Sequence, residues 1–231
     1  MNSSIPFRIC SRTCVRILAA SILTLLVAAS CWAQAGKVES IGRLTEATVA
    51  EAVRAAVSAK GYRFAPDDAS AAIEIWYRKE VPAQPKGASG SAVYDRLTPS
   101  ALVGVLHFTK AANDFRGQSV AAGFYTLRAA LMPDDGNHLG VAPSRDFLLL
   151  VPAAADPGPE ATPKFADLVA LSRQASGTKH PTPLSLVSAE AGSAPALTKD
   201  DEGHVIFTAT VPLSSGEDLP VALIVKGTAS Q

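Results

Sequence analysis

The sequence predicts a mainly β protein, an antiparallel β-sandwich of about seven or eight strands with two short covering helices. Several segments alternate apolar and polar residues with a period of two, as strands with one buried face do. Turn residues separate these segments at short intervals, which is typical of sandwiches and barrels. Only two segments have helical periodicity. That is too few for a parallel sheet, in which a helix follows each strand.

The first 35 residues have the layout of a bacterial-type secretory signal peptide. A basic region precedes an uncharged apolar run over 17–30, and Ala33 and Ala35 suit a cleavage site. The apolar run is shorter than the about 20 residues that cross a bilayer. We therefore expect a signal peptide over 1–35 and one exported domain over 36–231 with no transmembrane span. Its expected location is the periplasm or the extracellular space.

A second processing route stays open at Cys31. The stretch Ala28-Ala29-Ser30-Cys31 loosely resembles a lipobox, in which the cysteine becomes a lipidated N-terminus, although the usual leucine is absent. Lipidation would anchor the protein to the envelope, whereas cleavage after Ala35 would release it. In the latter case the mature chain has no cysteine, because all three precede residue 36: Cys10, Cys14 and Cys31. Disulfides and thiolate metal sites are then excluded.

The charge balance gives no sign of a nucleic-acid partner. The chain has 21 basic and 21 acidic residues. The leader contributes only basic residues, so its removal leaves a weakly acidic domain with scattered charge. Nucleic-acid-binding domains instead concentrate lysine and arginine on one face.

The first helix is predicted over about 48–60. Thr48 and Glu51 fit a capping box, and Gly61 suits the position just past a helix end. Valines recur every four residues and form one apolar stripe: Val49, Val53 and Val57. The stripe predicts a helix that covers a sheet.

The next elements are strands, and a second helix interrupts them. The apolar patterns predict strands at 72–81, 102–109, 124–132, 146–151, 184–188, 204–211 and 221–226. The strand at 146–151 contains four consecutive aliphatic residues, which predict burial on both faces. In the first of these, Ile73, Ile75 and Tyr77 share one face, and Trp76 is on the other, either exposed or under a helix. The second helix is predicted over 163–175, after a Pro-rich linker at 152–163.

Three stretches resemble a group of exported bacterial β-rich proteins. These are Gly123-Phe-Tyr-Thr-Leu-Arg128, the run from Asp135 to Pro152, and Leu168 to Pro181. The resemblance covers about half of the mature chain. It implies an exported β-rich protein and no particular activity, because the function of the group is unknown. The Gly-x-Tyr-x-Leu strand start is also similar to that of transthyretin-like sandwich domains.

The segment 134–146 is the predicted binding site. It combines Asp135, His138, Arg145 and Asp146 in a loop between two strong strands, a place where binding residues are common. His180, which follows the second helix, could complete a small polar pocket. The same side chains could equally make structural contacts, and Asp134-Asp135-Gly136 is more simply a tight turn than a calcium loop.

The function that we predict is that of an exported, envelope-associated binding or structural protein with no enzymatic activity and no cofactor. No Gly-x-Ser-x-Gly elbow is present, and the four histidines are too far apart in sequence for a zinc motif. One alternative is a hydrolase or metal-dependent enzyme that uses the loop 134–146. The other is a carrier of a small apolar ligand between the sheets.

Overall fold

The fold is mainly β, as predicted, but its strands form one large curled sheet. The computed structural model describes residues 1, 36–67, 70–133, 142–189, 192 and 194–229. Within these residues ten strands form an antiparallel sheet in the order β1-β2-β3-β4-β7-β8-β9-β12-β11-β10. Two further strands, β5 and β6, form a hairpin. The sandwich of seven or eight strands is therefore not confirmed.

The bounds of the elements are as follows. The strands are β1 Glu39–Ile41, β2 Gly61–Phe64, β3 Ile73–Tyr77, β4 Leu102–Phe108, β5 Ala112–Asn113, β6 Ser119–Val120, β7 Gly123–Leu131, β8 Asp146–Pro152, β9 Pro183–Val187, β10 Ala196–Lys199, β11 Val205–Pro212 and β12 Asp218–Lys226. The helices are α1 Glu51–Ala56 and α2 Phe165–Ser176, with a short 3-10 turn at Ala153–Ala155. None of the helices in the described part of the chain has the length and apolar character needed to cross a membrane.

The sheet curls so that strands far apart in its order meet across the interior. Phe64 of β2 stacks on Phe207 of β11, with ring centroids 4.4 Å apart. Beyond β3, Val81 forms a parallel bridge with Leu213, just past the end of β11. The inner face of the sheet is a continuous apolar core to which nine of the ten strands contribute. A curled sheet of this kind buries one face around a single core, which a flat sheet of ten strands does not do.

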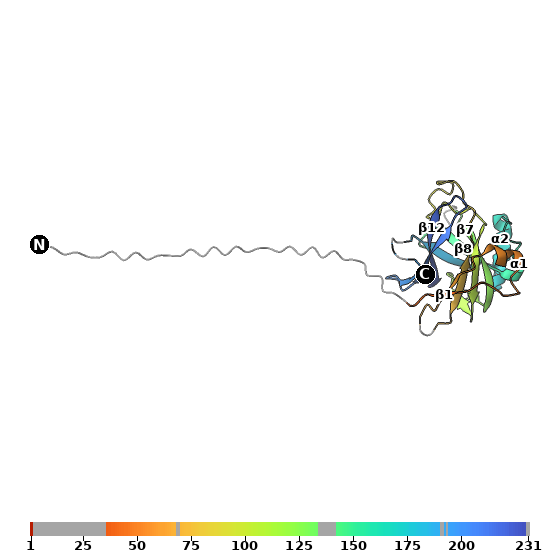
Figure 1. Cartoon of the computed structure of the whole chain (residues 1–231), viewed down its shortest axis with the longest axis horizontal. Coiled ribbons are helices and arrows are strands. Elements are labelled where there is room, and N and C mark those ends of the chain that lie inside the picture. Colours follow the sequence, from red (N-terminus) through yellow and green to blue (C-terminus); the bar gives the residue numbers. More distant parts are fainter. Residues whose placement is uncertain (2–35, 68–69, 134–141, 190–191, 193, 230–231) are drawn as a thin grey trace. The chain divides into compact units, whose positions relative to one another are not determined.

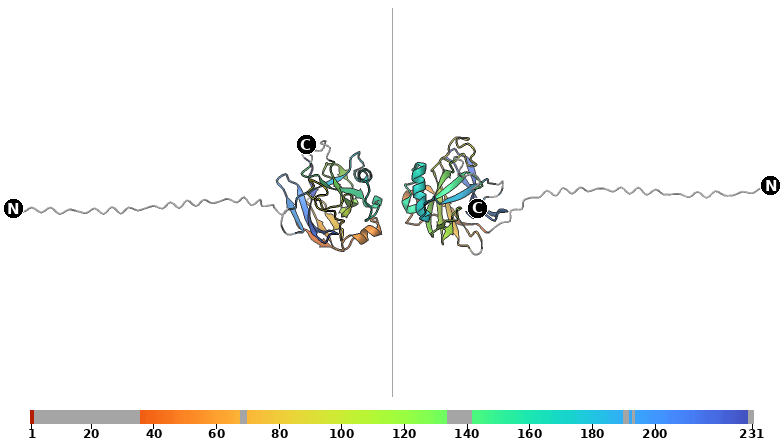
Figure 2. Two further views of the ribbon diagram at one scale, coloured as in Figure 1. Left: turned by 90° about the horizontal axis from the view of Figure 1, so that it is seen from above. Right: turned by 180° about the vertical axis from the view of Figure 1, so that it is seen from behind.

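Both helices lie outside the curl, on neighbouring parts of its outer face (Figures 1 and 2). Val53 of α1 belongs to an apolar cluster with Trp76 and Val105, on the outer face of β3 and β4. Leu168 of α2 packs with Leu149 and Val151, on the outer face of β8. The strand β8 is thus covered on both faces, which explains its run of consecutive aliphatic residues and confirms the predicted buried strand.

The second helix is confirmed, and the first is much shorter than predicted. The helix α1 covers only Glu51–Ala56, and the Thr48–Glu51 capping box does not form, since the Thr48 amide donates to Glu46 instead. After α1, Val57 forms a bridge with Arg78 of the sheet. Gly61 starts the strand β2, where a side chain would collide with the indole of Trp76. The glycine that looked like a helix stop is therefore required by packing in the sheet.

The Pro-rich stretch 152–163, predicted as a linker, is fastened to the outer face of the sheet. Arg128 of β7 is fully buried and makes two hydrogen bonds to the carboxylate of Asp156, at 2.8 and 2.7 Å. Its remaining donors reach the backbone carbonyls of Ser100, Gly158 and Ala161. All five N–H groups of this guanidinium are thus satisfied, as a buried arginine requires.

Candidate functional site

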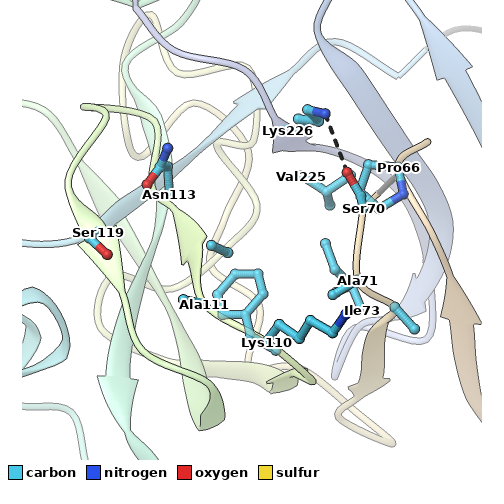
Figure 3. Close-up of a pocket in the computed structure, with 13 residues that line it drawn as sticks. Pro66, Ser70, Ala71, Ile73, Lys110, Ala111, Asn113, Ser119, Val225 and Lys226 are labelled. Atoms are coloured by element: carbon cyan, nitrogen blue, oxygen red, sulfur yellow. Dashed lines mark hydrogen bonds between the residues drawn. The ribbon is translucent and has the colours of Figure 1, made fainter. Parts of the chain in front are cut away.

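A pocket lies at one end of the curled sheet, and we call it the mouth pocket (Figure 3). At this end β3 begins, and β4 and β12 end. The pocket has a volume of about 400 Å³, in the lower part of the range for small-molecule sites. Its lining residues are Pro66, Ser70, Ala71, Ala72, Ile73, Phe108, Lys110, Ala111, Ala112, Asn113, Ser119, Val225 and Lys226.

The floor of the mouth pocket is apolar and belongs to the core. Ile73, Phe108 and Val225 are buried, and each lies at the end of a strand where the inner face of the sheet reaches the pocket. Four alanines line the walls and leave space that longer side chains would fill: Ala71, Ala72, Ala111 and Ala112. Because the floor side chains are almost fully buried, the apolar surface that a ligand can cover comes mostly from these alanines.

Polar side chains occupy the rim of the pocket. Lys226 forms an ion pair with Asp67 and donates a hydrogen bond to the Ser70 hydroxyl at 3.3 Å. Hydrogen bonds from Lys226 and Ser70 lower the pKa of the Asp67 carboxyl to about 2. Asp67 is thus ionised at neutral pH, and its charge holds the Lys226 ammonium at the wall.

Lys110 lies just past β4, the other strand that ends at the pocket. Thr109, which directly follows β4, donates hydrogen bonds from its amide and its hydroxyl to the carbonyl of Ala72, the hydroxyl at 2.7 Å. Lys110 follows directly and is exposed, and its side chain runs along the pocket towards Ala71 and Ile73 in Figure 3. No ion pair or hydrogen bond joins the Lys110 ammonium to another residue of the described part of the chain.

The β5–β6 hairpin forms the third wall of the pocket, and Asp114 holds its turn. The carboxylate of Asp114 accepts hydrogen bonds from the backbone amides of Arg116 and Gln118 and from the Gln118 side chain. Burial raises the pKa of this carboxyl, against the effect of the Gln118 hydrogen bonds. This network fixes the hairpin that carries Asn113 and Ser119.

The structure gives the predicted site residues different surroundings. Asp135 and His138 lie outside the described residues. Asp146 is 2% exposed, and its two carboxylate oxygens accept the backbone amides of Val93 and Tyr94 at 2.8 and 2.9 Å. Asp146 thus anchors the segment that covers the far end of the sheet.

Arg145 and His180 both lie near Met132, but they have different surroundings. Arg145 donates two hydrogen bonds to the Met132 carbonyl, at 3.2 and 2.9 Å. His180 is exposed and lines a separate groove of about 230 Å³ beside α2, together with Met132, Phe147 and Phe165. This groove is mainly apolar, so it is not the small polar pocket that the sequence suggested.

The other histidines form separate structural contacts. His107 of β4 lies 2.8 Å from Glu74 of β3 and stacks on Phe124. His204 lies 2.9 Å from Asp200, across the turn between β10 and β11. Among the described residues, no three His, Cys, Asp or Glu side chains are grouped so that they could hold a metal ion.

Sequence reasoning missed the mouth pocket because its residues are common ones at strand ends. One signal was available: Lys110 and Lys226 each follow or end a predicted strand. Strands that run in the same direction end at the same edge of a sheet, so the two lysines could have been placed together once the strand order was known. No family model, no curated protein and no solved structure matches this chain.

Proposed function

We propose that this chain is an exported, non-enzymatic protein that binds a small molecule in the mouth pocket. One observation supports the proposal above all: a pocket of about 400 Å³ lies at the end of the curled sheet, next to its buried apolar core. Sites for small molecules combine apolar surface with polar groups that orient the ligand, and this pocket offers both. Export is proposed from the residues of the leader.

This proposal modifies the carrier alternative and disfavours the enzymatic one. A carrier that holds its ligand between two sheets needs an internal cavity, whereas the pocket proposed here lies at an end of the curled sheet, next to its apolar core. An enzyme needs ionisable groups that converge in one pocket. Of the predicted residues, Asp146 is committed to backbone amides, and His180 lines an apolar groove.

Binding of a neutral fluorescent probe tests the proposal. N-phenyl-1-naphthylamine increases its fluorescence in apolar surroundings, and we expect the full chain to bind it. Ala111→Trp places a large side chain in the mouth pocket and should abolish most of this signal. Ala88→Trp is the matched control, because Ala88 is exposed and does not line the pocket.

The pair of variants separates binding in the pocket from binding elsewhere, including the apolar leader. Circular dichroism and thermal unfolding should show that both variants are folded. The proposal is wrong if the full chain does not bind the probe, or if Ala111→Trp and Ala88→Trp bind it equally well.

A further inference from the structure

We infer that the ligand of the mouth pocket is an anionic amphiphile, a small molecule with an apolar body and one acidic head group such as a carboxylate. This inference rests on the proposed function, because it names the class of ligand for the same site. Three observations support it. The charged residues of the lining are both lysines, Lys110 has no ion pair among the described residues, and the pocket also offers apolar surface.

The charge of the lining is entirely positive. Lys110 and Lys226 are the charged residues among the thirteen that line the pocket, and no acidic residue of the described part of the chain is among them. Asp67, which is not among the lining residues, compensates Lys226, and among the described residues this leaves the positive charge of Lys110 in excess. An anion is therefore favoured at the rim, and a cation is repelled.

The two lysines have different roles. Lys226 is held in position by Asp67 and Ser70, which accept two of the three hydrogens of its ammonium group. Lys110 has no such partner among the described residues, so it can turn towards a ligand without breaking an ion pair. An acidic head group could then be held between a fixed and an adjustable ammonium.

The alanine walls determine the rest of the ligand. Their methyl groups offer apolar surface and no hydrogen-bonding side chain, whereas Phe108, Ile73 and Val225 at the floor are almost fully buried and add little surface. A polar body, such as a sugar, would lose hydrogen bonds to water there without replacement. An alkyl or aromatic body loses none, and its burial is favourable. One molecule matches both the positive rim and the apolar surface of the pocket if it carries an acidic head group and an apolar body. Such a molecule is an anionic amphiphile.

Competition by two matched molecules tests the ligand class. Octanoate and octanamide have the same chain and differ in the charge of the head group, and each is used to displace N-phenyl-1-naphthylamine from the full chain. We expect octanoate to bind about threefold to tenfold more tightly, the range for one or two partly exposed ion pairs. Raising the salt concentration should reduce this preference, because screening weakens exposed ion pairs.

Two variants change the charge at the rim in opposite directions. Lys110→Met keeps the apolar stem and removes the charge, so it should weaken octanoate binding much more than octanamide binding and so reduce the preference for octanoate. Asp67→Asn removes the acid that competes for Lys226, so it should strengthen octanoate binding. Lys86→Met is the control, because Lys86 is an exposed lysine in the segment that covers the opposite end of the sheet.

The results distinguish the two proposals. If the probe does not bind, or binds regardless of Ala111→Trp, the proposed function itself is wrong. If the probe binds in the pocket but octanoate is no better than octanamide, the inference is overturned and the proposed function stands. The inference is also overturned if Lys110→Met behaves like Lys86→Met.

Discussion

Removal of one hydroxyl group, in Tyr94→Phe, should destabilise this fold strongly. The Tyr94 hydroxyl lies between β9 and β12, where Val187 and Ala222 face each other in register. It donates a hydrogen bond to the Val187 carbonyl at 2.6 Å and accepts one from the Ala222 amide at 2.9 Å. The side chain thus completes the ladder between two strands of the sheet.

The expected cost follows from the two groups that lose their partner. Phenylalanine fills almost the same space, so the apolar packing of Tyr94 is kept. The Val187 carbonyl and the Ala222 amide would be left without this hydrogen bond, at about 1–3 kcal/mol for each buried group. We expect the free energy of unfolding to fall by about 2–4 kcal/mol, since some relaxation would let the two strands approach.

Tyr77 provides a matched control in the same core. Its hydroxyl is buried and has no hydrogen-bond partner among the described residues, and burial raises the pKa of this phenol. Tyr77→Phe removes a buried hydroxyl that makes no hydrogen bond to the described residues. The substitution should therefore leave the free energy of unfolding unchanged or raise it by up to about 2 kcal/mol. The two substitutions are chemically identical, but only Tyr94→Phe should destabilise the fold.

Urea unfolding followed by fluorescence and circular dichroism measures both variants. The slope of the unfolding free energy against denaturant should stay unchanged, which shows that the same surface is exposed on unfolding. The reasoning is refuted if Tyr94→Phe changes the stability by less than about 0.5 kcal/mol, the scatter of ordinary surface substitutions. It is also refuted if Tyr77→Phe is as destabilising as Tyr94→Phe.

Three further predictions concern buried polar groups. Burial raises the pKa of Tyr94 to about 12. Because the unfolded state releases this proton from about pH 10, the free energy of unfolding should fall between pH 10 and 12. Thermal unfolding over a pH series should show a smaller fall in Tyr94→Phe. Arg128→Met leaves the buried Asp156 carboxylate without its partner, so we expect a loss of about 3–5 kcal/mol in urea unfolding, largely rescued by adding Asp156→Asn; no rescue would contradict the pairing. Asp146→Ala removes the acceptor of two backbone amides, so the free energy of unfolding should fall by about 1–3 kcal/mol. Probe binding in the mouth pocket, measured by fluorescence, should persist. Its loss would show that Asp146 contributes to the pocket.

Local patterns were sufficient for the strands that have one clear buried face. The alternation from Ile73 to Tyr77 placed Trp76 on the outer face, and the structure finds its indole under the first helix segment, with a hydrogen bond to the Gly42 carbonyl at 2.8 Å. The aliphatic run before Pro152 was correctly expected to be buried on both sides. In these segments the sequence within about ten residues already specifies which side chains are buried.

Local patterns failed where a distant contact decides the conformation. Gly61 has the sequence features of a helix stop, and only the position of Trp76 explains why it belongs to a strand. Prolines suggested a linker at 152–163, but Arg128, which is on another strand, fastens that stretch to the sheet. Neither interaction has a signal within the segment that it controls.

The sequence by itself determined that this protein is mainly β, where most of its strands lie, and that two helical segments cover them, because the period of the apolar residues is a local property. Only the tertiary structure decided that ten strands join in one curled sheet, since the strand order depends on contacts such as that between Phe64 and Phe207. The same curl brings Lys110 and Lys226 to one pocket. The candidate site is thus a product of strand order, which no single segment encodes.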